Sequence, residues 1–599
     1  MAASARRIAC SLVFSTLALC SHFARADDRE QVARCPQQLP ADPGRRSPDA
    51  REMPAFEATP CDPGALPPPR AAEPGRFLGL PDRWRIVSTL GYPENLRDPY
   101  HGNNWLKGDW PVFGEDWFTS LTAVSDTLLE PRSFPLPVGV AVTERAGSLD
   151  LLGHGASQLY AETLGFEAVL YKGDTVFKPP EWEFRLEPVV SINHVEVPER
   201  ALLGAVAAAP LTRTRSTLGL QAAFVDRHLR NVSSRYDFDS IRIGIQPMTA
   251  DFRGFLFNDA PLGVRLFGIR ANNRYQYNLG WFRRLEKDVN SGLNDVFRHG
   301  GAALRHDDVL LANLYAQDTP RPGFTSQAVI VHNRNREGAK RTYDINGVLE
   351  RPAALGDGRG RDYDVTYVGY NGDGHVGPLN LSVSAYGVAG RETRGTFTNA
   401  SDQVRAYFWA AELSRDFNWL RVRASAAVQS ADRNPLDSKA TGFDAILENP
   451  LFAGADTSFW IREAVPLVAG GRVSLSGRNG LLASLRSSKE AGQSNFTNPG
   501  LVLAGVGADA DLTPQLRVSA NANDLRFGDT SALELARAQA PIPRRIGLDL
   551  SLAASWRPRT TQNIVARFSA AYLVPGAGWR ALYGNRAGWA VLANLVLTY

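Results

Sequence analysis

The stretch Trp589-Ala-Val-Leu-Ala-Asn-Leu-Val-Leu-Thr-Tyr599 decides the fold. Side chains of a β-strand alternate between two faces, so one face here carries every second residue from Trp589 to Tyr599, and all of these residues are apolar or aromatic. An apolar face with an aromatic ring at each end fits a hydrocarbon layer between two polar interfaces. The stretch therefore predicts a strand over 589–599 that crosses a membrane.

A membrane strand that closes the chain on an aromatic residue resembles the assembly signal of bacterial outer-membrane β-barrels. The resemblance implies the outer membrane of a Gram-negative cell as the location, and the lipid of that membrane and the barrel assembly machinery as partners. The other end of the chain agrees with export. Arg6 and Arg7 precede an apolar run over 8–19, and Ala24-Arg25-Ala26 gives the A-x-A pattern of a cleavage site. We therefore expect residues 1–26 to be a signal peptide that is removed.

Residues 27–116 are expected to form an N-terminal extension in the periplasm. Proline clusters and charges dominate 27–82, which predicts a flexible segment, whereas the aromatic-rich stretch 83–116 predicts an ordered lead-in to the first strand. Cys35 and Cys61 are an even pair in an oxidising compartment, so we expect a disulfide between them. A periplasmic partner that docks on this extension is an open alternative.

Segments with a period of two recur from Trp117 onward. Segment 182–196 shows the pattern most clearly, because Phe184 and Leu186 point one way while Glu183, Arg185 and Glu187 point the other way. The pattern predicts about eighteen strands, which are 117–129, 158–171, 182–196, 216–229, 239–251, 263–270, 274–286, 307–317, 323–335, 361–371, 378–389, 402–414, 419–430, 501–512, 516–527, 545–557, 562–573 and 589–599. An even number suits a single-chain bacterial barrel with both ends in the periplasm, and the short and long links alternate as that topology requires. We therefore expect an all-β fold, a transmembrane antiparallel up-and-down β-barrel over 117–599, with about sixteen or twenty strands as the alternatives.

Aromatic residues gather at the ends of the predicted strands. In the expected topology, one set faces lipid at the periplasmic ends and a second set at the outer ends, as amphipathic rings do at the two membrane interfaces. The predicted membrane-interface aromatics are Trp117, Trp182, Trp419, Trp556, Trp589 and Tyr599.

Composition and motifs exclude other classes of protein. The mean hydropathy is −0.23, and after the first 26 residues no segment approaches the ~20 consecutive apolar residues of a membrane-spanning helix. The net charge of +4 gives no sign of a nucleic-acid partner. The sequence has no G-x-S-x-G, no H-E-x-x-H and no Cys/His set with metal-ligand spacing. We therefore expect no enzyme, no catalytic residue, no metal and no cofactor.

A barrel of about eighteen strands encloses a lumen that its wall side chains do not fill. The predicted pore-lining residues are Arg185, Arg227, Arg242, Arg284, Arg421, Arg423, Arg517, Arg567, Glu183, Glu187 and Asp549. Rings of one sign of charge select ions of the opposite sign, but this set is mixed. One interpretation is a basic arc that attracts carboxylate-bearing solutes. The alternative is that the charges pair across neighbouring strands and keep the wall hydrated.

The longest connection, 431–500, is rich in residues that proteins usually bury. Its run Ala445-Ile-Leu-Glu-Asn-Pro-Leu-Phe452 is an example. Long loops are usually functional or disordered, and this composition argues against disorder. We expect the loop to fold inward and to form part of a constriction, with an external cap or an extra hairpin as the alternative.

Two turn patterns late in the chain resemble the alginate-export type of outer-membrane channel. They are Asn498-Pro-Gly-Leu-Val-Leu503 and Asp511-Leu-Thr-Pro-Gln-Leu-Arg517. The resemblance implies passive passage of an anionic polysaccharide through a basic lumen, whereas the acidic residues on the predicted lumen face depart from that pattern. The function we expect is a passive channel, or porin, for small polar or anionic solutes or glycans. The alternatives are a TonB-dependent receptor, for which the chain is short of the roughly 22 strands and the plug, and a non-conducting barrel that docks a periplasmic partner.

Overall fold

The computed structural model describes the barrel region of the chain in detail. The described residues are 91, 95–97, 104–133, 156–173, 179–198, 203, 206, 208–235, 237–288, 290–297, 304–343, 347, 360–454, 465–466, 472–473, 493–559 and 562–599. The predicted signal peptide, Cys35, Cys61 and the extension up to residue 90 lie outside the described residues. No helix in the described ranges is long and apolar enough to cross a membrane.

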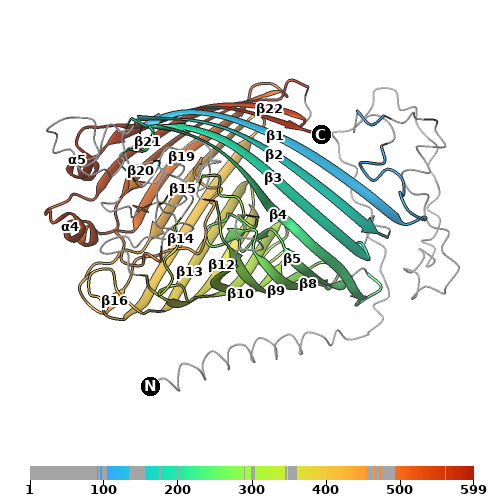
Figure 1. Ribbon diagram of the computed structural model, residues 1–599, viewed down its shortest axis with the longest axis horizontal. Helices are drawn as coiled ribbons and strands as arrows, with labels where there is room; N and C mark the ends of the chain where they lie inside the picture. The colour runs from blue at the N-terminus through green and yellow to red at the C-terminus, as the bar shows by residue number, and fades with distance from the viewer. Residues whose placement is uncertain are drawn as a thin grey trace, which may run out of the picture. The chain divides into compact units, whose positions relative to one another are not determined.

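Eighteen long antiparallel strands form one closed sheet (Figure 1). They are β1 (Trp117–Ser133), β2 (Ala156–Lys172), β3 (Trp182–Glu196), β4 (Thr212–Asn231), β5 (Phe238–Ile245), β8 (Leu262–Arg270), β9 (Tyr275–Leu285), β10 (Leu304–Ala316), β11 (Phe324–Asn335), β12 (Tyr363–Val376), β13 (Leu379–Glu392), β14 (Asp402–Phe417), β15 (Leu420–Gln429), β19 (Leu501–Asp511), β20 (Leu516–Arg526), β21 (Arg545–Trp556), β22 (Ile564–Pro575) and β23 (Gly588–Thr598). Each corresponds to one of the predicted strands, so the predicted all-β barrel is confirmed.

Short elements lie between the long strands. They are β6 (Met248–Thr249), β7 (Asn258–Asp259), β16 (Lys439–Ala440), β17 (Val465–Pro466), β18 (Arg472–Val473), α4 (Ser531–Arg537) and α5 (Ala577–Tyr583). Strand β5 ends at Ile245, six residues before the predicted end at 251, because the chain leaves the wall there. The two helices belong to the long connections that precede β21 and β23.

The first and last strands close the barrel. Val124 of β1 is opposite Thr598 of β23, and the pairing runs to Ser133 opposite Trp589. Strand β1 extends beyond the end of β23, and the lead-in segment pairs with this free edge, since Leu121 N donates to Leu106 O at 2.6 Å. Asn104 Nδ2 also donates to the hydroxyl of Tyr599 at 2.9 Å. The lead-in therefore covers part of the edge of β1 that extends past the end of the last strand.

The two faces of the wall differ in the way a membrane barrel requires. On β3, Phe184 and Leu186 point outward and are 39% and 50% exposed, whereas Asn193 points inward and is fully buried. Exposed apolar residues recur on the outward face of the other strands, as at Val368 of β12 and Val506 of β19. Among the predicted interface aromatics, the exposed rings are Trp419, Trp556 and Trp589. An apolar exterior over a polar interior is the pattern of a transmembrane barrel.

Candidate functional site within the barrel

Two connections fold inside the wall and pair with each other. One joins β5 to β8, and the other is the first part of the long connection after β15. Phe257 forms a parallel bridge with Leu447, and Ile446 N donates to Leu256 O at 3.0 Å. Leu451 N donates to Arg253 O at 2.8 Å. We call residues 248–260 and 442–453 together the inner platform.

The inner platform packs on the inward face of the wall through aromatic rings. The ring of Phe255 lies 4.8 Å from that of Phe408, measured between centroids, and Phe443 stacks on the same ring at 5.0 Å. The hydroxyl of Tyr367 donates to the backbone oxygen of Asp444 at 2.8 Å. All four rings are buried. The wall under the platform therefore carries an apolar surface where an open lumen would carry a polar one.

Polar contacts fix the platform on strands β11–β14. Asp251 accepts hydrogen bonds from the backbone N–H groups of Phe255 (3.1 Å) and Leu256 (3.0 Å) and from the hydroxyl of Tyr386 (2.9 Å). Gln327 Nε2 donates to Ala250 O at 2.7 Å. These bonds join the turn at 250–257 directly to the wall.

Arg253 and Ala453 extend these contacts toward β20. Arg253 Nη2 lies 3.5 Å from carboxylate oxygens of both Asp373 and Glu412. Ala453 N donates to Glu412 of β14 at 3.1 Å, and Ala453 O accepts from Asn523 of β20 at 3.2 Å. The platform thus extends along the inner wall from β14 to β20, which is three strands away from β14 in the sheet. For residues 431–454 of the loop 431–500, the structure shows the inward folding that we expected; residues 455–464, 467–471 and 474–492 of this loop lie outside the described residues.

A buried ionic network lies beside the platform. Arg284 is fully buried and contacts Asp259 of the platform (3.2 Å) and Asp307 of β10 (3.1 Å). Lys287 Nζ also contacts Asp259, at 2.5 Å, and Arg305 contacts Asp307 at 3.4 Å. Because Arg284 has no exposed surface, it does not border a solvent-filled path, and the prediction that it lines the pore is wrong. Its guanidinium instead holds a platform carboxylate against the wall.

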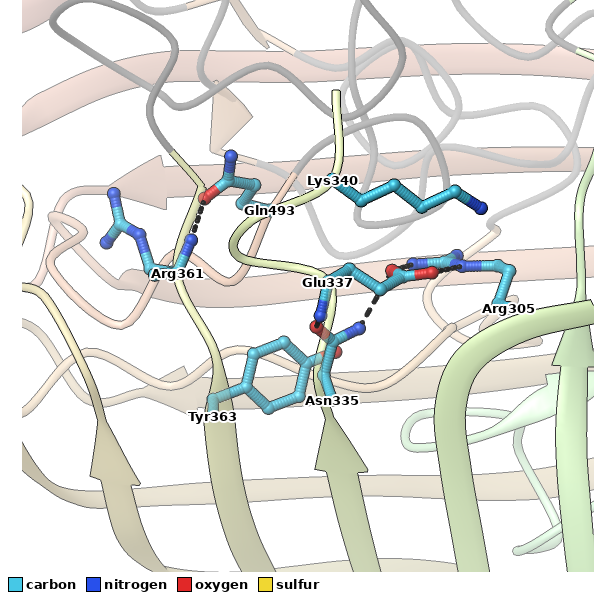
Figure 2. Close-up of a pocket in the computed structure, with 7 residues that line it drawn as sticks. All are labelled: Arg305, Asn335, Glu337, Lys340, Arg361, Tyr363 and Gln493. Carbon is cyan, nitrogen blue, oxygen red and sulfur yellow. Dashed lines mark hydrogen bonds and ion pairs between the residues drawn. The ribbon is translucent and has the colours of Figure 1, made fainter. Parts of the chain in front are cut away.

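A small polar pocket lies next to this network, toward the end of the barrel with the long connections (Figure 2). Its volume is about 20 Å³, room for about one water molecule. Arg305 of this pocket contacts Glu337 at 2.8 Å, and Arg361 N donates to the side-chain oxygen of Gln493 at 3.0 Å. The remaining lining residues are Asn335, Lys340 and Tyr363. Arg305 pairs with Glu337 inside the pocket, and Arg361 pairs with the buried Glu392 beside it at 3.5 Å, so these charges support the wall.

Most of the other predicted lumen residues face inward and form ion pairs. The pairs are Arg185 with Glu183 (2.9 Å) and Glu167 (2.9 Å), Arg242 with Asp226 (2.8 Å), Arg421 with Asp416 (2.5 Å), Arg423 with Asp509, and Arg517 with Asp511 (2.6 Å). Glu187 lies on the inward face of β3, and Asp549 is buried on the inward face of β21. Arg567 also points inward and is exposed there, because its neighbour Phe568 takes the outward position. The interior is therefore charged but locally balanced.

Arg227 lies on the outer face of the barrel, so its assignment to the lumen is wrong. It is opposite Trp182 of β3, and its guanidinium lies 4.6 Å from the centre of that ring. The cause is a bulge, since Glu187 is opposite Ala222 but Pro188 is opposite Leu220, which leaves Gln221 as an extra residue in β4. One extra residue exchanges the two faces of the strand beyond it. A uniform period of two read from Leu218 therefore gives the wrong face for Arg227.

Sequence reasoning missed the half of the platform that lies between β5 and β8, residues 248–260. Asp251 ends the predicted strand 239–251, and Arg253 and Phe255 fall between two predicted strands without a predicted role. The available signal was the run Phe252-Arg-Gly-Phe-Leu-Phe257, which is too aromatic for a short exposed turn. Gly254 supports the sharp turn, because its φ is +73° and a Cβ there would lie 2.5 Å from Asn449 O.

These features define a class: a closed eighteen-stranded outer-membrane-type β-barrel whose connections fold into a charged interior. No model of a known protein family matches the sequence, and no curated protein matches it. Among solved structures, the chain is similar to OccAB3 of Acinetobacter baumannii (TM-score 0.44, 11% identity, 80% of this chain and 99% of that one). It is also similar to OccK9 (OpdG) of Pseudomonas aeruginosa (TM-score 0.43, 12% identity, 80% and 97%) and to OccK5 (OpdH) of the same organism (TM-score 0.40, 11% identity, 80% and 97%). At these identities the likeness concerns the barrel fold alone.

Proposed function

We propose that this protein is a passive outer-membrane channel, or porin, for small polar solutes. The observation that carries the proposal is a closed barrel with an apolar exterior, whose charged interior is narrowed on one side by the inner platform. A wall of this size does not fill its own lumen. Loops that fold inward are the parts that set the width of such a path, and inward charges set its preference.

The balance of positive and negative side chains inside the barrel determines whether the proposed channel prefers anionic or cationic solutes. Arg421, Arg423 and Arg517 each pair with an aspartate, which favours the alternative of paired lumen charges over the basic arc. Arg567 adds an exposed positive charge on the same inward face. We infer a channel with weak preference for anions, through which small anionic solutes or short glycans pass by diffusion. Passage of an anionic polysaccharide of the alginate type is the finer form of this proposal.

Conductance of the purified full-length protein in planar bilayers tests the proposal. We expect discrete single-channel openings, and in a salt gradient a reversal potential shifted slightly toward the anion. Liposome swelling with neutral and carboxylated sugars of increasing size then defines the solute. Absence of conductance in protein that has folded would favour the barrel scaffold, and uptake that needs cellular energy would favour the TonB-dependent receptor.

A further inference from the structure

A row of charged residues crosses the outer face of β9–β14, where the apolar part of each strand ends. The row follows the strand register from one strand to the next. Its members are Arg283, Asp308, Arg334, Asp364, Arg391 and Gln403, followed by Lys439 of β16. Arg405 of β14 lies one outward position below Gln403. We call Arg334, Arg391, Arg405 and Lys439 the basic patch.

The positions directly below the row show that it borders the hydrocarbon. On β9 the next outward residue is Trp281, and on β10 it is Leu310. On β12 and β14 the outward apolar residues begin at Val368 and Tyr407. These four apolar side chains are 47–56% exposed on the outer face, as expected for side chains that contact lipid in the membrane. The row therefore lies where lipid head groups meet the wall.

The carboxylates in and around the row already have partners. Asp308 accepts hydrogen bonds from Nε and Nη2 of Arg283, each at 2.9 Å. Asp364 contacts Arg336 and His332, each at 2.9 Å. Two bordering carboxylates accept backbone N–H groups: Asp362 from Gly338 and Asp437 from Lys439, each at 2.7 Å.

The cations of the basic patch, by contrast, are exposed and can bind an external anion. Arg334, Arg391, Arg405 and Lys439 are exposed. Within the described residues none of them forms an ion pair; Arg405 has a 3.5 Å contact with the neutral amide of Gln403. Counting Arg283 and Arg336 as well, six cations face four carboxylates, so the surface has an excess of positive charge. Exposed cations at the edge of an apolar wall attract anionic head groups.

We propose that the basic patch binds the phosphate groups of the phosphorylated glycolipid in the outer leaflet. The patch lies at the end of the barrel with the long connections, which the topology expected from the sequence places outside the cell, so the inference rests on that orientation and on the proposed function. Arginine forks match phosphate oxygens and form charge-assisted hydrogen bonds with them. The acyl chains of the same lipid would cover Leu310, Val368 and Tyr407 below the patch. Both halves of an amphipathic lipid therefore have a complementary surface.

Lipid binding to the purified full-length protein in neutral detergent tests the proposal. The probe is bisphosphorylated lipid A, compared with its dephosphorylated form, and bound lipid is counted by native mass spectrometry during a titration. We expect the wild type to bind the bisphosphorylated form at least about tenfold more tightly, and R334Q/R391Q/R405Q to lose most of that preference. Added salt should reduce the preference in the wild type.

A matched control uses two outward arginines on another part of the wall. Arg526 and Arg545 both contact Asp524, at 2.9 and 3.3 Å. R526Q/R545Q should bind lipid as the wild type does. Equal binding of both lipid forms, equal binding by the triple variant, or the same loss in the control pair would overturn the proposal. Phosphatidic acid that competes equally well would overturn the assignment to the glycolipid. Unchanged conductance of R334Q/R391Q/R405Q would show that the barrel is folded and separates this proposal from the channel function.

Discussion

The hydroxyl of Tyr386 on β13 donates a hydrogen bond of 2.9 Å to Asp251, which in turn caps the backbone turn of the inner platform. Both residues are buried, and each lies on a different element. A bond of this kind does not build the wall, because the strand pairing of β13 is independent of it. It fixes the position of the platform relative to the wall, which in the proposed channel sets the width of the solute path.

Replacement Y386F should loosen the platform without weakening the barrel. The change removes one hydroxyl and leaves Asp251 one donor short, which costs about 1–3 kcal/mol locally. We expect larger or noisier single-channel currents and faster hydrogen exchange over 250–257, with an unchanged unfolding midpoint. The control is Y407F, since Tyr407 is an exposed outward residue on the next strand. Equal currents in Y386F and the wild type would show that the platform does not limit flow.

Neighbouring arginines on β9 should differ sharply in their effect on stability. Arg284 is fully buried between Asp259 and Asp307, and its removal leaves buried carboxylates without their counter-charge. We expect R284A to lower the free energy of unfolding by about 3–5 kcal/mol. Arg283 pairs with Asp308 on the outer face, and R283A should cost about 0–1 kcal/mol. Urea unfolding in lipid vesicles measures both, and similar losses would contradict the assignment of Arg284 to a buried support.

The strands could be read from the sequence because a membrane wall imposes a period of two along its whole length. The same rule fails in two places for physical reasons. Strand β14 carries apolar residues on both faces, Phe408 inward and Tyr407 outward, since the platform covers one face and lipid the other. The alternation of apolar and polar residues, which marks a strand with one face in water, is therefore absent from this part of β14. The sequence alone does not show that the platform covers the inward face. Pro188 opposite the bulge and Gly219 beside it are residues that often mark a bulge, but a uniform period of two takes no account of them, and it therefore gives the wrong face for Arg227.

The charge partners were equally hidden from the sequence. Arg421 and Asp416 are close in the chain and lie on either side of one tight turn, so their pairing could have been expected. Arg253 and Glu412 are far apart in the chain, and their contact depends on a connection entering the barrel. A list of inward charges therefore predicts a hydrated wall, but which charges stay unbalanced depends on the register and on the loops.

The loop segment that begins after β15 should be held more firmly at mildly acidic pH. Asp432 is buried beside Thr441, and burial raises its pKa to about 6. A raised pKa means that the folded loop binds a proton more tightly than the released loop, whose aspartate has an ordinary pKa of 3.8. The stabilisation is thus present at low pH and is lost as the pH rises through about 6. Hydrogen exchange over 430–443, corrected for the intrinsic rate, should be slower at pH 5 than at pH 7.5. D432N should remove this dependence, and a wild-type loop with equal protection at both pH values would refute it.

The opposite faces of Arg227 and Arg242 predict opposite results for ion selectivity. Arg242 points inward and pairs with the buried Asp226 at 2.8 Å, whereas Arg227 points outward over Trp182. R242Q leaves an uncompensated carboxylate in the interior, so the reversal potential in a salt gradient should move toward cation preference. R227Q removes a charge from the outer surface, which the wall separates from the path, and should leave the reversal potential unchanged. A shift in R227Q as large as that in R242Q would mean that the bulge in β4 is absent from the working channel and that Arg227 faces the lumen after all.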